Sequence, residues 1–323
     1  MNNWRAYGHL KAISLLAPAL TVFAAFCSVV ACERDAPRAQ SMATKELPST
    51  PAPDSGPPPS NHSVEALAGE EDLENRFHHT VTVTPFPSPP RGISKQCSGV
   101  LVSPRAVLTA GHCFCSKRKA GLTGMEGSLI IDGTECITTA IVTTFVYSKS
   151  EQGSGPSYQA REYRGTVRLH PAFKITTDEQ ENVLSSTGDL AIVSLNTPAG
   201  EALPAIPLAS MGVKLNETVT LVGYGYDETF GTLGGRRRHF KARVTGSPDT
   251  AGGRALLEKP SQTRYKGDSG GPCLRETAQG MELVGILSRA LGQEPSFTST
   301  HLYEHWLKEE IQRASAPEQA PGR

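Results

Sequence analysis

Near residue 270 the sequence reads Lys266-Gly267-Asp268-Ser269-Gly270-Gly271-Pro272, with one serine between an aspartate and two glycines. A serine hydroxyl becomes a good nucleophile only when a neighbouring base removes its proton. Glycines beside it allow a sharp turn and let successive backbone N–H groups converge on a developing oxyanion. The segment therefore predicts a nucleophile loop around Ser269, although a glycine-rich turn without chemistry is the alternative interpretation.

A candidate base lies upstream in Leu108-Thr109-Ala110-Gly111-His112-Cys113, which ends an apolar run that begins at Cys97. A histidine titrates near neutral pH, so it can take up a proton and return it. A lone histidine is more often a surface residue. Here a cysteine adjoins His112, and Cys97 upstream is available to pin the loop, so the pattern favours a functional histidine.

The third candidate is Asp189, in Thr187-Gly188-Asp189-Leu190-Ala191-Ile192. An aspartate at the head of an apolar strand is usually a turn residue or a cap. Its significance comes from its place in the chain, after His112 and before Ser269.

With these segments in this order, the chain resembles the trypsin/chymotrypsin-like serine peptidases, whose triad follows the order His, Asp, Ser. The resemblance spans about residues 64–314 and includes three further landmarks: His170-Pro171-Ala172-Phe173, Val222-Gly223-Tyr224-Gly225 and Gly285-Ile286-Leu287-Ser288. It implies an all-β fold of two packed six-stranded antiparallel barrels of the chymotrypsin type with a C-terminal helix, and an active site between the barrels.

The resemblance also implies the role of each residue. Ser269 attacks the peptide carbonyl, His112 takes and returns the proton, and Asp189 orients the imidazole. The N–H groups of Gly267 and Ser269 form the oxyanion hole. The implied activity is that of a serine endopeptidase on protein or peptide substrates, with no metal and no cofactor.

Substrate-binding positions follow from the same resemblance. Counting back from Ser269 puts the base of the specificity pocket at Thr263, while Ser288 and Ala290 contact the substrate. Thr263 is not the aspartate that would attract basic side chains. With Arg264 and Arg289 nearby, we hypothesise a preference for polar or acidic side chains.

Activation is left open by the sequence. The family frees an apolar amino terminus whose amine pairs with the aspartate before the nucleophile, here Asp268. Ala66-Leu67-Ala68-Gly69 is a degenerate match to that terminus, with no basic residue before it. An internal Arg or Lys is the alternative partner for Asp268, because an unpaired buried carboxylate is costly.

Composition and periodicity agree with a β-rich domain. The 31 glycines and 24 prolines predict many turns, and short apolar runs at regular spacing favour a sandwich or barrel. We expect the N-terminal barrel at about 64–195 and the C-terminal barrel at about 207–300. Apolar residues at helical spacing predict a helix at about 300–314, and 315–323 is expected to be a disordered tail.

The amino-terminal region predicts export. Arg5 and Lys11 precede an uncharged apolar run up to Ala31, so 1–31 is interpreted as a signal peptide. Residues 32–63 form a Pro/Ser-rich tether or propeptide. Cys32 follows the run as in a bacterial lipobox and is a lipidation candidate. Ordinary cleavage after Ala31, or a cysteine there by chance, are the alternatives. The predicted location is secreted or extracytoplasmic, with a lipid on Cys32 as a potential bacterial membrane anchor.

Seven cysteines occur in the chain. The resemblance implies a disulfide between Cys97 and Cys113, which fits an oxidising compartment. A second pair, Cys115 with Cys136, is a hypothesis, since Cys273 is either a free thiol or takes one of that pair. A metal site is disfavoured because the cysteines lack paired ligand spacing.

The charge balance excludes one function class and leaves others. With 32 basic and 32 acidic residues the chain gives no sign of nucleic-acid binding. We also expect the protein to be a monomer. Two alternatives to the endopeptidase stay open. One is a catalytically silent or zymogen-like binding module with the peptidase fold, and the other is an esterase-type hydrolase that uses the same acyl chemistry.

Overall fold

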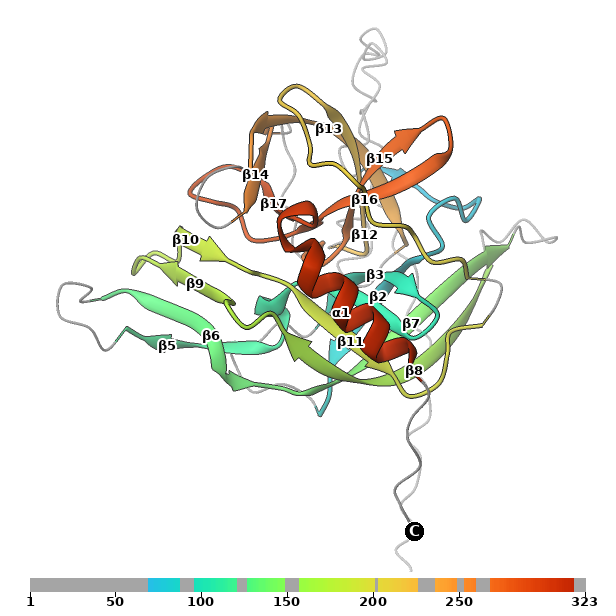
Figure 1. The fold of residues 1–323 in the computed structure, drawn as a ribbon, viewed down its shortest axis with the longest axis horizontal. Helices are drawn as coiled ribbons and strands as arrows, with labels where there is room; N and C mark the ends of the chain where they lie inside the picture. Colours follow the sequence, from blue (N-terminus) through green and yellow to red (C-terminus); the bar gives the residue numbers. More distant parts are fainter. Residues whose placement is uncertain are drawn as a thin grey trace, which may run out of the picture. The chain divides into compact units, whose positions relative to one another are not determined.

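The computed structural model describes residues 69–87, 96–120, 127–148, 157–200, 203–225, 236–248, 253–259 and 268–316. All of them belong to one compact unit, Ser63–Arg323. Strands dominate this unit and a helix closes it, in agreement with the predicted all-β class (Figure 1).

The N-terminal barrel has six antiparallel strands: β2 (Thr80–Pro85), β3 (Cys97–Ser103), β4 (Ala106–Thr109), β7 (Thr139–Ser148), β8 (Ser157–Leu169) and β11 (Ala191–Leu195). They close in the order β11-β4-β3-β2-β7-β8. Strands β3 and β4 are buried along their whole length, which their β-branched and other apolar residues favour.

The C-terminal barrel also has six strands: β12 (Thr218–Gly223), β13 (Arg238–Gly246), β14 (Arg254–Leu257), β15 (Pro272–Thr277), β16 (Gly280–Leu287) and β17 (Ser296–Ser299). Their order is β13-β12-β15-β16-β17-β14, and pairing of β13 with β14 closes the ring. The two barrels predicted from the resemblance are therefore confirmed.

A short strand, β1 (Glu70–Glu71), precedes the first barrel in the chain but pairs with β13 of the second. Gly69 leads into it with φ +68°, and a Cβ there would lie 2.8 Å from the carbonyl oxygen of His239. Glycine is needed at this close approach. The first described strand of the chain therefore belongs to the sheet of the C-terminal barrel, and the strands of the N-terminal barrel follow it.

A four-stranded sheet that the sequence did not predict lies beside the first barrel. It consists of β5 (Cys115–Lys119), β6 (Leu129–Cys136), β9 (Lys174–Thr177) and β10 (Val183–Thr187). The strand order is β10-β9-β6-β5. In Figure 1 this sheet projects to the left of β7 and β8. The hairpins β5–β6 and β9–β10 both lie between His112 and Asp189 in the chain, so the sheet begins next to these two residues.

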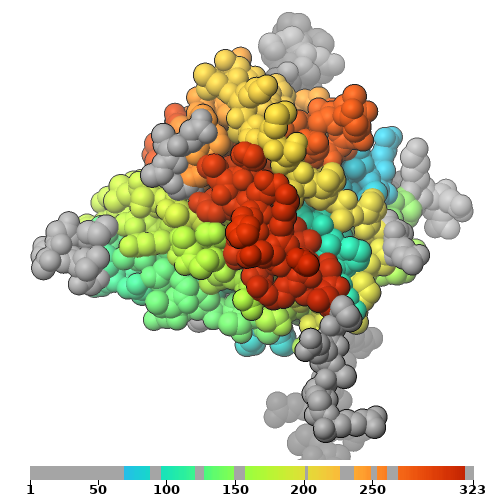
Figure 2. Space-filling view, viewed as in Figure 1, coloured from blue at the N-terminus to red at the C-terminus, as the bar shows by residue number. Residues whose placement is uncertain are grey.

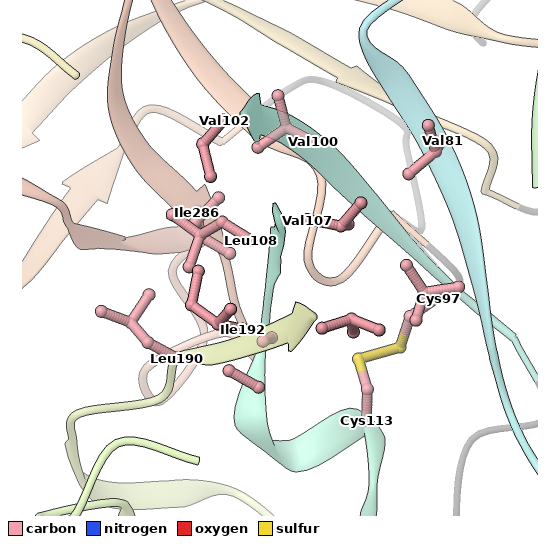
Figure 3. Packing of buried hydrophobic residues seen from close by; sticks show 14 of the residues in the cluster. Val81, Cys97, Val100, Val102, Val107, Leu108, Cys113, Leu190, Ile192 and Ile286 are labelled. Carbon is pink, nitrogen blue, oxygen red and sulfur yellow. A yellow bond between two sulfur atoms is a disulfide. The ribbon is translucent and has the colours of Figure 1, made fainter. Parts of the chain in front are cut away.

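The two barrels share a hydrophobic interface. Figure 3 shows Ile286 of β16 packed beside Leu108 of β4 and Ile192 of β11. All three side chains are fully buried. Because dense apolar packing resists displacement, the barrels hold the loops at their junction in fixed positions.

The chain ends in the 3-10 turn η2 (His301–Tyr303) and helix α1 (Glu304–Ser315), close to the predicted 300–314. Helix α1 returns to the N-terminal barrel, where Glu310 pairs with Arg168 at 3.0 Å and Ser315 Oγ donates to Ser103 Oγ at 3.2 Å. Figure 2 shows this helix along the surface. No helix among the described residues is long and apolar enough to cross a membrane.

Candidate active site

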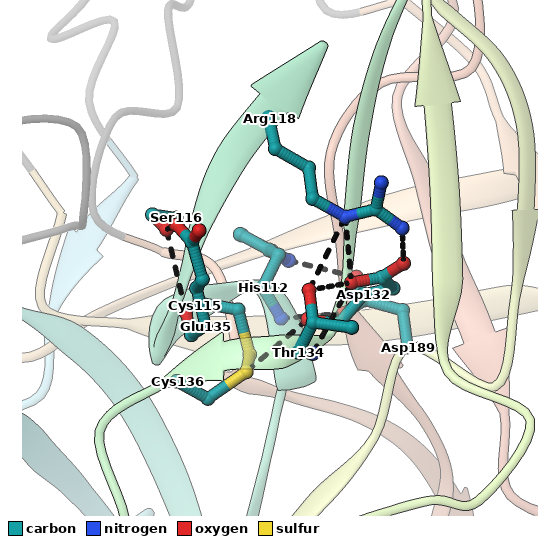
Figure 4. Close-up of a disulfide and its surroundings, with 9 residues drawn as sticks. All are labelled: His112, Cys115, Ser116, Arg118, Asp132, Thr134, Glu135, Cys136 and Asp189. Atoms are coloured by element: carbon teal, nitrogen blue, oxygen red, sulfur yellow. Dashed lines mark hydrogen bonds and ion pairs between the residues drawn. A yellow bond between two sulfur atoms is a disulfide. The ribbon is translucent and has the colours of Figure 1, made fainter. Parts of the chain in front are cut away.

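The register between two strands brings His112 and Asp189 together. Ala191 of β11 pairs with Thr109 of β4, so the residues just before β11 lie opposite the short 3-10 helix η1 (Gly111–Cys113). The main-chain N–H of His112 donates to Oδ1 of Asp189 at 2.8 Å. The ring Nδ1 of His112 lies 2.7 Å from Oδ2 (Figure 4). Both residues are buried.

Asp189 is held as a carboxylate. Burial acts to raise its pKa, but the charge and hydrogen bonds of His112, the charge of Arg254 and the hydroxyl of Ser288 together lower the pKa well below its usual range. Ser288 Oγ donates to Oδ2. An ionised acceptor requires the proton on Nδ1 of His112, which leaves Nε2 as the basic nitrogen of the neutral ring.

The turn that carries Asp189 is braced by the end of the chain. The N–H of Gly188 donates to the Tyr303 hydroxyl at 2.9 Å. The His170 ring packs edge-on against Tyr303 and Trp306, with centroid distances of 4.7 and 4.9 Å. The landmark histidine found in the sequence thus docks η2 and α1 behind the aspartate.

Ser269 lies on the C-terminal barrel and is tied to the N-terminal one through Ser98. The N–H of Ser98 donates to the Ser269 carbonyl at 2.8 Å, and Thr109 Oγ1 donates to the Ser98 carbonyl at 2.7 Å. Gly270 has φ +85°, and a Cβ there would lie 2.1 Å from Thr109 Oγ1 and 3.1 Å from the Ala110 nitrogen. The nucleophile loop is therefore in contact with the segment that leads into His112.

Within the described ranges, no hydrogen bond links His112 to the Ser269 hydroxyl. Hydrogen bonds of this kind are often long without a substrate and tighten when one is bound. Ser269 is partly exposed, and its loop packs against the segment before the histidine.

The position of Asp268 is the reason why residues 223 and 225 are glycines. Its Oδ1 accepts the N–H of Gly225 at 2.8 Å. Cβ atoms at Gly223 and Gly225 would lie 2.1 and 2.7 Å from the same oxygen, so only glycine leaves room for the carboxylate. Burial raises the pKa of Asp268 to about 6, against the N–H of Gly225 and the charge of Arg238. Ala66, the candidate amine donor that the sequence left open beside an internal Arg or Lys, lies outside the described residues.

Two disulfides flank the histidine. One joins Cys97 to Cys113, and the other joins Cys115 to Cys136 between β5 and β6 (Figure 4). Cys273 is a buried free thiol whose pKa burial raises well above its usual value. The pairing that the sequence left open is thus Cys115 with Cys136.

Of the other site residues predicted from the sequence, some lie among the described residues and some lie outside them. Ser288 and Ala290 are described and lie where β16 leaves the junction, directly beyond Leu287, whose N–H donates to the Gly271 carbonyl at 2.8 Å. Three predicted positions lie outside the described residues: Gly267, Thr263 and Cys32. Among the described residues, no group of three or more His, Cys, Asp or Glu side chains is arranged to hold a metal ion.

Sequence reasoning missed Arg254, which lies behind the site. It is almost fully buried, and its Nη2 donates to the Arg289 carbonyl and to Ser296 Oγ. Burial lowers the pKa of Arg254 to about 10, against the charge of Asp189, so the guanidinium stays charged at neutral pH. An isolated arginine beside two glycines looks like a surface residue in sequence, and no pattern marked it.

Two six-stranded barrels with a buried His–Asp pair and a glycine-flanked serine loop at their junction define the chymotrypsin class of fold. The family model described as Trypsin matches residues 69–307, and the chain belongs to that family.

Similar proteins are about one quarter identical in sequence to this chain over the aligned residues. Kallikrein-10 of Homo sapiens is 26% identical over 244 residues, which covers 68% of this chain and 75% of that protein. The cercarial protease of Schistosoma mansoni is 28% identical over 208 residues, covering 60% and 70%. Lectizyme of Glossina austeni is 25% identical over 238 residues, covering 67% and 77%. These matches support a hydrolase of the trypsin class.

Proposed function

We propose that this protein is a serine endopeptidase that hydrolyses peptide bonds through an acyl-enzyme, with His112, Asp189 and Ser269 as its catalytic residues. The observation that carries the proposal is the double contact of Asp189 with His112, through Oδ1 to the main-chain N–H and through Oδ2 to Nδ1. This contact fixes the ring so that Nε2 is free to act as the base.

In the proposed reaction Ser269 Oγ attacks the substrate carbonyl carbon while its proton passes to Nε2 of His112. The oxyanion is stabilised by the N–H groups of Gly267 and Ser269. The imidazolium, stabilised by Asp189, then protonates the departing amine. A water molecule attacks the resulting ester by the same route and regenerates the serine.

Several finer features remain proposals from the sequence. They are the specificity pocket at Thr263, its preference for polar or acidic side chains, export through the signal peptide 1–31, the lipid on Cys32 and the monomeric state. The two disulfides support an oxidising, extracytoplasmic compartment. Intact-mass measurement of protein isolated from membranes tests the lipid, since unmodified Cys32 would contradict it.

The test of the proposed function is covalent labelling of the folded protein with a fluorophosphonate probe. We expect labelling of the unaltered protein and none of Ser269→Ala. Ser116→Ala is the matched control, because its hydroxyl bonds Glu135 on β6 and takes no part in the site. Absence of labelling in a folded sample would favour the silent or zymogen-like module. Ester hydrolysis without peptide hydrolysis would favour the esterase.

A further inference from the structure

Ser269 and His112 lie on different barrels, so contacts across the barrel junction set the distance between them. Several of these contacts meet at Ser98, a fully buried residue of β3. The N–H of Ser98 donates to the Ser269 carbonyl at 2.8 Å, and its Oγ accepts the N–H of Tyr224, directly after β12, at 2.9 Å. Ser98 is therefore bonded to the C-terminal barrel through both its main chain and its side chain.

Thr109, the last residue of β4, bonds a further polar group of Ser98. Its Oγ1 donates to the Ser98 carbonyl at 2.7 Å, and the threonine is fully buried. A buried hydroxyl that is already bonded gives up its partner only at a cost, so this contact is a fixed link. Two hydrogen bonds in series thus run from the strand that leads into His112 to the residue proposed as the nucleophile, Ser269.

A covalent bond joins the neighbours of this link. Cys97 precedes Ser98 and Cys113 follows His112, and the two cysteines form a disulfide (Figure 3). The disulfide holds the loop of the base against the start of β3. The segment Cys97–Ser98 therefore contacts the loops of both His112 and Ser269, and Thr109 bonds this segment from β4.

The nucleophile loop packs closely around Thr109. A Cβ on Gly270 would lie 2.1 Å from Thr109 Oγ1, and a Cβ on Gly271 would lie 3.3 Å from the Cβ of Ser98. The Gly270 N–H also donates to the Leu287 carbonyl at 2.8 Å, which fixes the loop from the other side. Because the loop approaches this hydroxyl so closely, a change at Thr109 is expected to shift Ser269.

We propose that Thr109 is a positioning residue, whose hydroxyl holds Ser98 so that Ser269 Oγ stays in register with Nε2 of His112. This inference rests on the proposed peptidase function and adds to it a residue that touches neither the substrate nor the reacting atoms. A displacement of about 1 Å at a reacting group can lower a rate by about 100-fold. A small shift of the serine loop is therefore enough to affect catalysis.

Thr109→Val tests the inference, because valine has nearly the same shape and lacks the hydroxyl. We expect kcat and kcat/KM for a fluorogenic peptide to fall together, by between about tenfold and 100-fold, since only the geometry of attack changes. Thr109→Ser keeps the hydroxyl and should restore most of the rate. Thr144→Val is the matched control and should keep the full rate. Thr144 is 2% exposed, and its hydroxyl donates to the Arg161 carbonyl at 3.4 Å within the N-terminal barrel.

The rate and the extent of fluorophosphonate labelling separate positioning from loss of structure. If the hydroxyl positions Ser269, the Thr109→Val protein is labelled to completion but more slowly than the unaltered protein. If Thr109 only stabilises the fold, a smaller fraction of the molecules is labelled at an unchanged rate, and the inference is wrong. Complete labelling at an unchanged rate would also overturn it.

A second variant covers the case in which Thr109→Val does not fold. Thr109→Ala also removes the hydroxyl and adds no atoms, and Thr144→Ala is then its control. Labelling of the unaltered protein with equal rates in the Thr109 variants rejects only this inference. Absence of labelling in the folded, unaltered protein rejects the proposed function, and this inference with it.

Discussion

Nε of Arg237 lies 2.7 Å from Oδ2 of Asp72, and the two side chains are 0% and 2% exposed. The same carboxylate accepts the N–H groups of Arg76 and Phe77, and the guanidinium also donates to the Tyr224 hydroxyl at 3.1 Å. A fully bonded pair of this kind ties the entering segment to the C-terminal barrel.

Breaking this pair is expected to destabilise the fold strongly. Asp72→Ala leaves the Arg237 charge buried without its partner, and we expect a loss of about 3–5 kcal/mol in the free energy of unfolding. Glu71→Ala is the control, because its ion pairs with Arg236 and Arg238 are partly exposed and should contribute about 1 kcal/mol or less. Denaturant titration measures both, and similar losses in the two variants would contradict the assignment.

Arg254 is expected to set the acid limit of activity. Its charge helps to keep the pKa of Asp189 low, so Arg254→Met should raise that pKa. Without the buried positive charge of Arg254, the triad takes up a proton at a higher pH. The acid limb of the kcat/KM profile should therefore move to higher pH. Arg254→Lys keeps a charge and should restore much of the original profile. A purely structural role for Arg254 would lower kcat/KM at every pH without moving the limb.

His79 is expected to make the fold acid-sensitive. Burial first, and then the charges of His78 and Arg237, lower its pKa from 6.5 to about 3. Above about pH 6.5 the ring is neutral in both states and has no effect on stability. As the pH falls toward 3, the unfolded chain binds a proton that the folded state refuses, so stability falls by up to about 1.4 kcal/mol per pH unit.

The measurement for His79 is denaturant titration across this pH range. His79→Gln should flatten the decline, whereas His305→Gln, at a side chain that is 91% exposed, should leave it in place. An equal slope in the unaltered protein and in His79→Gln would show that other groups cause the acid sensitivity.

Gly270 is expected to be irreplaceable in the nucleophile loop. Its φ of +85° disfavours any side chain, and a Cβ would lie 2.1 Å from Thr109 Oγ1 and 2.2 Å from the Ser98 carbonyl. Gly270→Ala should therefore abolish fluorophosphonate labelling. Gly280→Ala separates strain from clash, because Gly280 has φ +128° with nothing within 4 Å of its Cβ position. That variant should lose some stability but keep its labelling.

The sequence could predict the barrels and the candidate catalytic residues because each depends on a short local pattern. The segments around His112, Asp189 and Ser269 carry residue types that their chemistry requires. The apolar runs of β3, β4 and β11 are long enough to be recognised as buried strands.

The remainder escaped prediction for physical reasons. Strand β5 reads Cys-Ser-Lys-Arg-Lys and has no alternation of apolar and polar residues, since it lies at the edge of a sheet. Strand β8 is mostly exposed, so little of it carries an apolar signal. The roles of Tyr303 and Arg254 come from contacts between residues far apart in the chain, such as Tyr303 with Gly188. No local pattern records such contacts.

The return of α1 to the first barrel has a consequence for the timing of synthesis. His112 and Asp189 are translated long before Tyr303, which receives the Gly188 N–H behind them, and before Glu310, which pairs with Arg168. A nascent chain that stops short of residue 301 has neither support, and before residue 269 it has no candidate nucleophile. The pair of His112 and Asp189 is therefore backed by these two contacts only after residues 301–310 have been made.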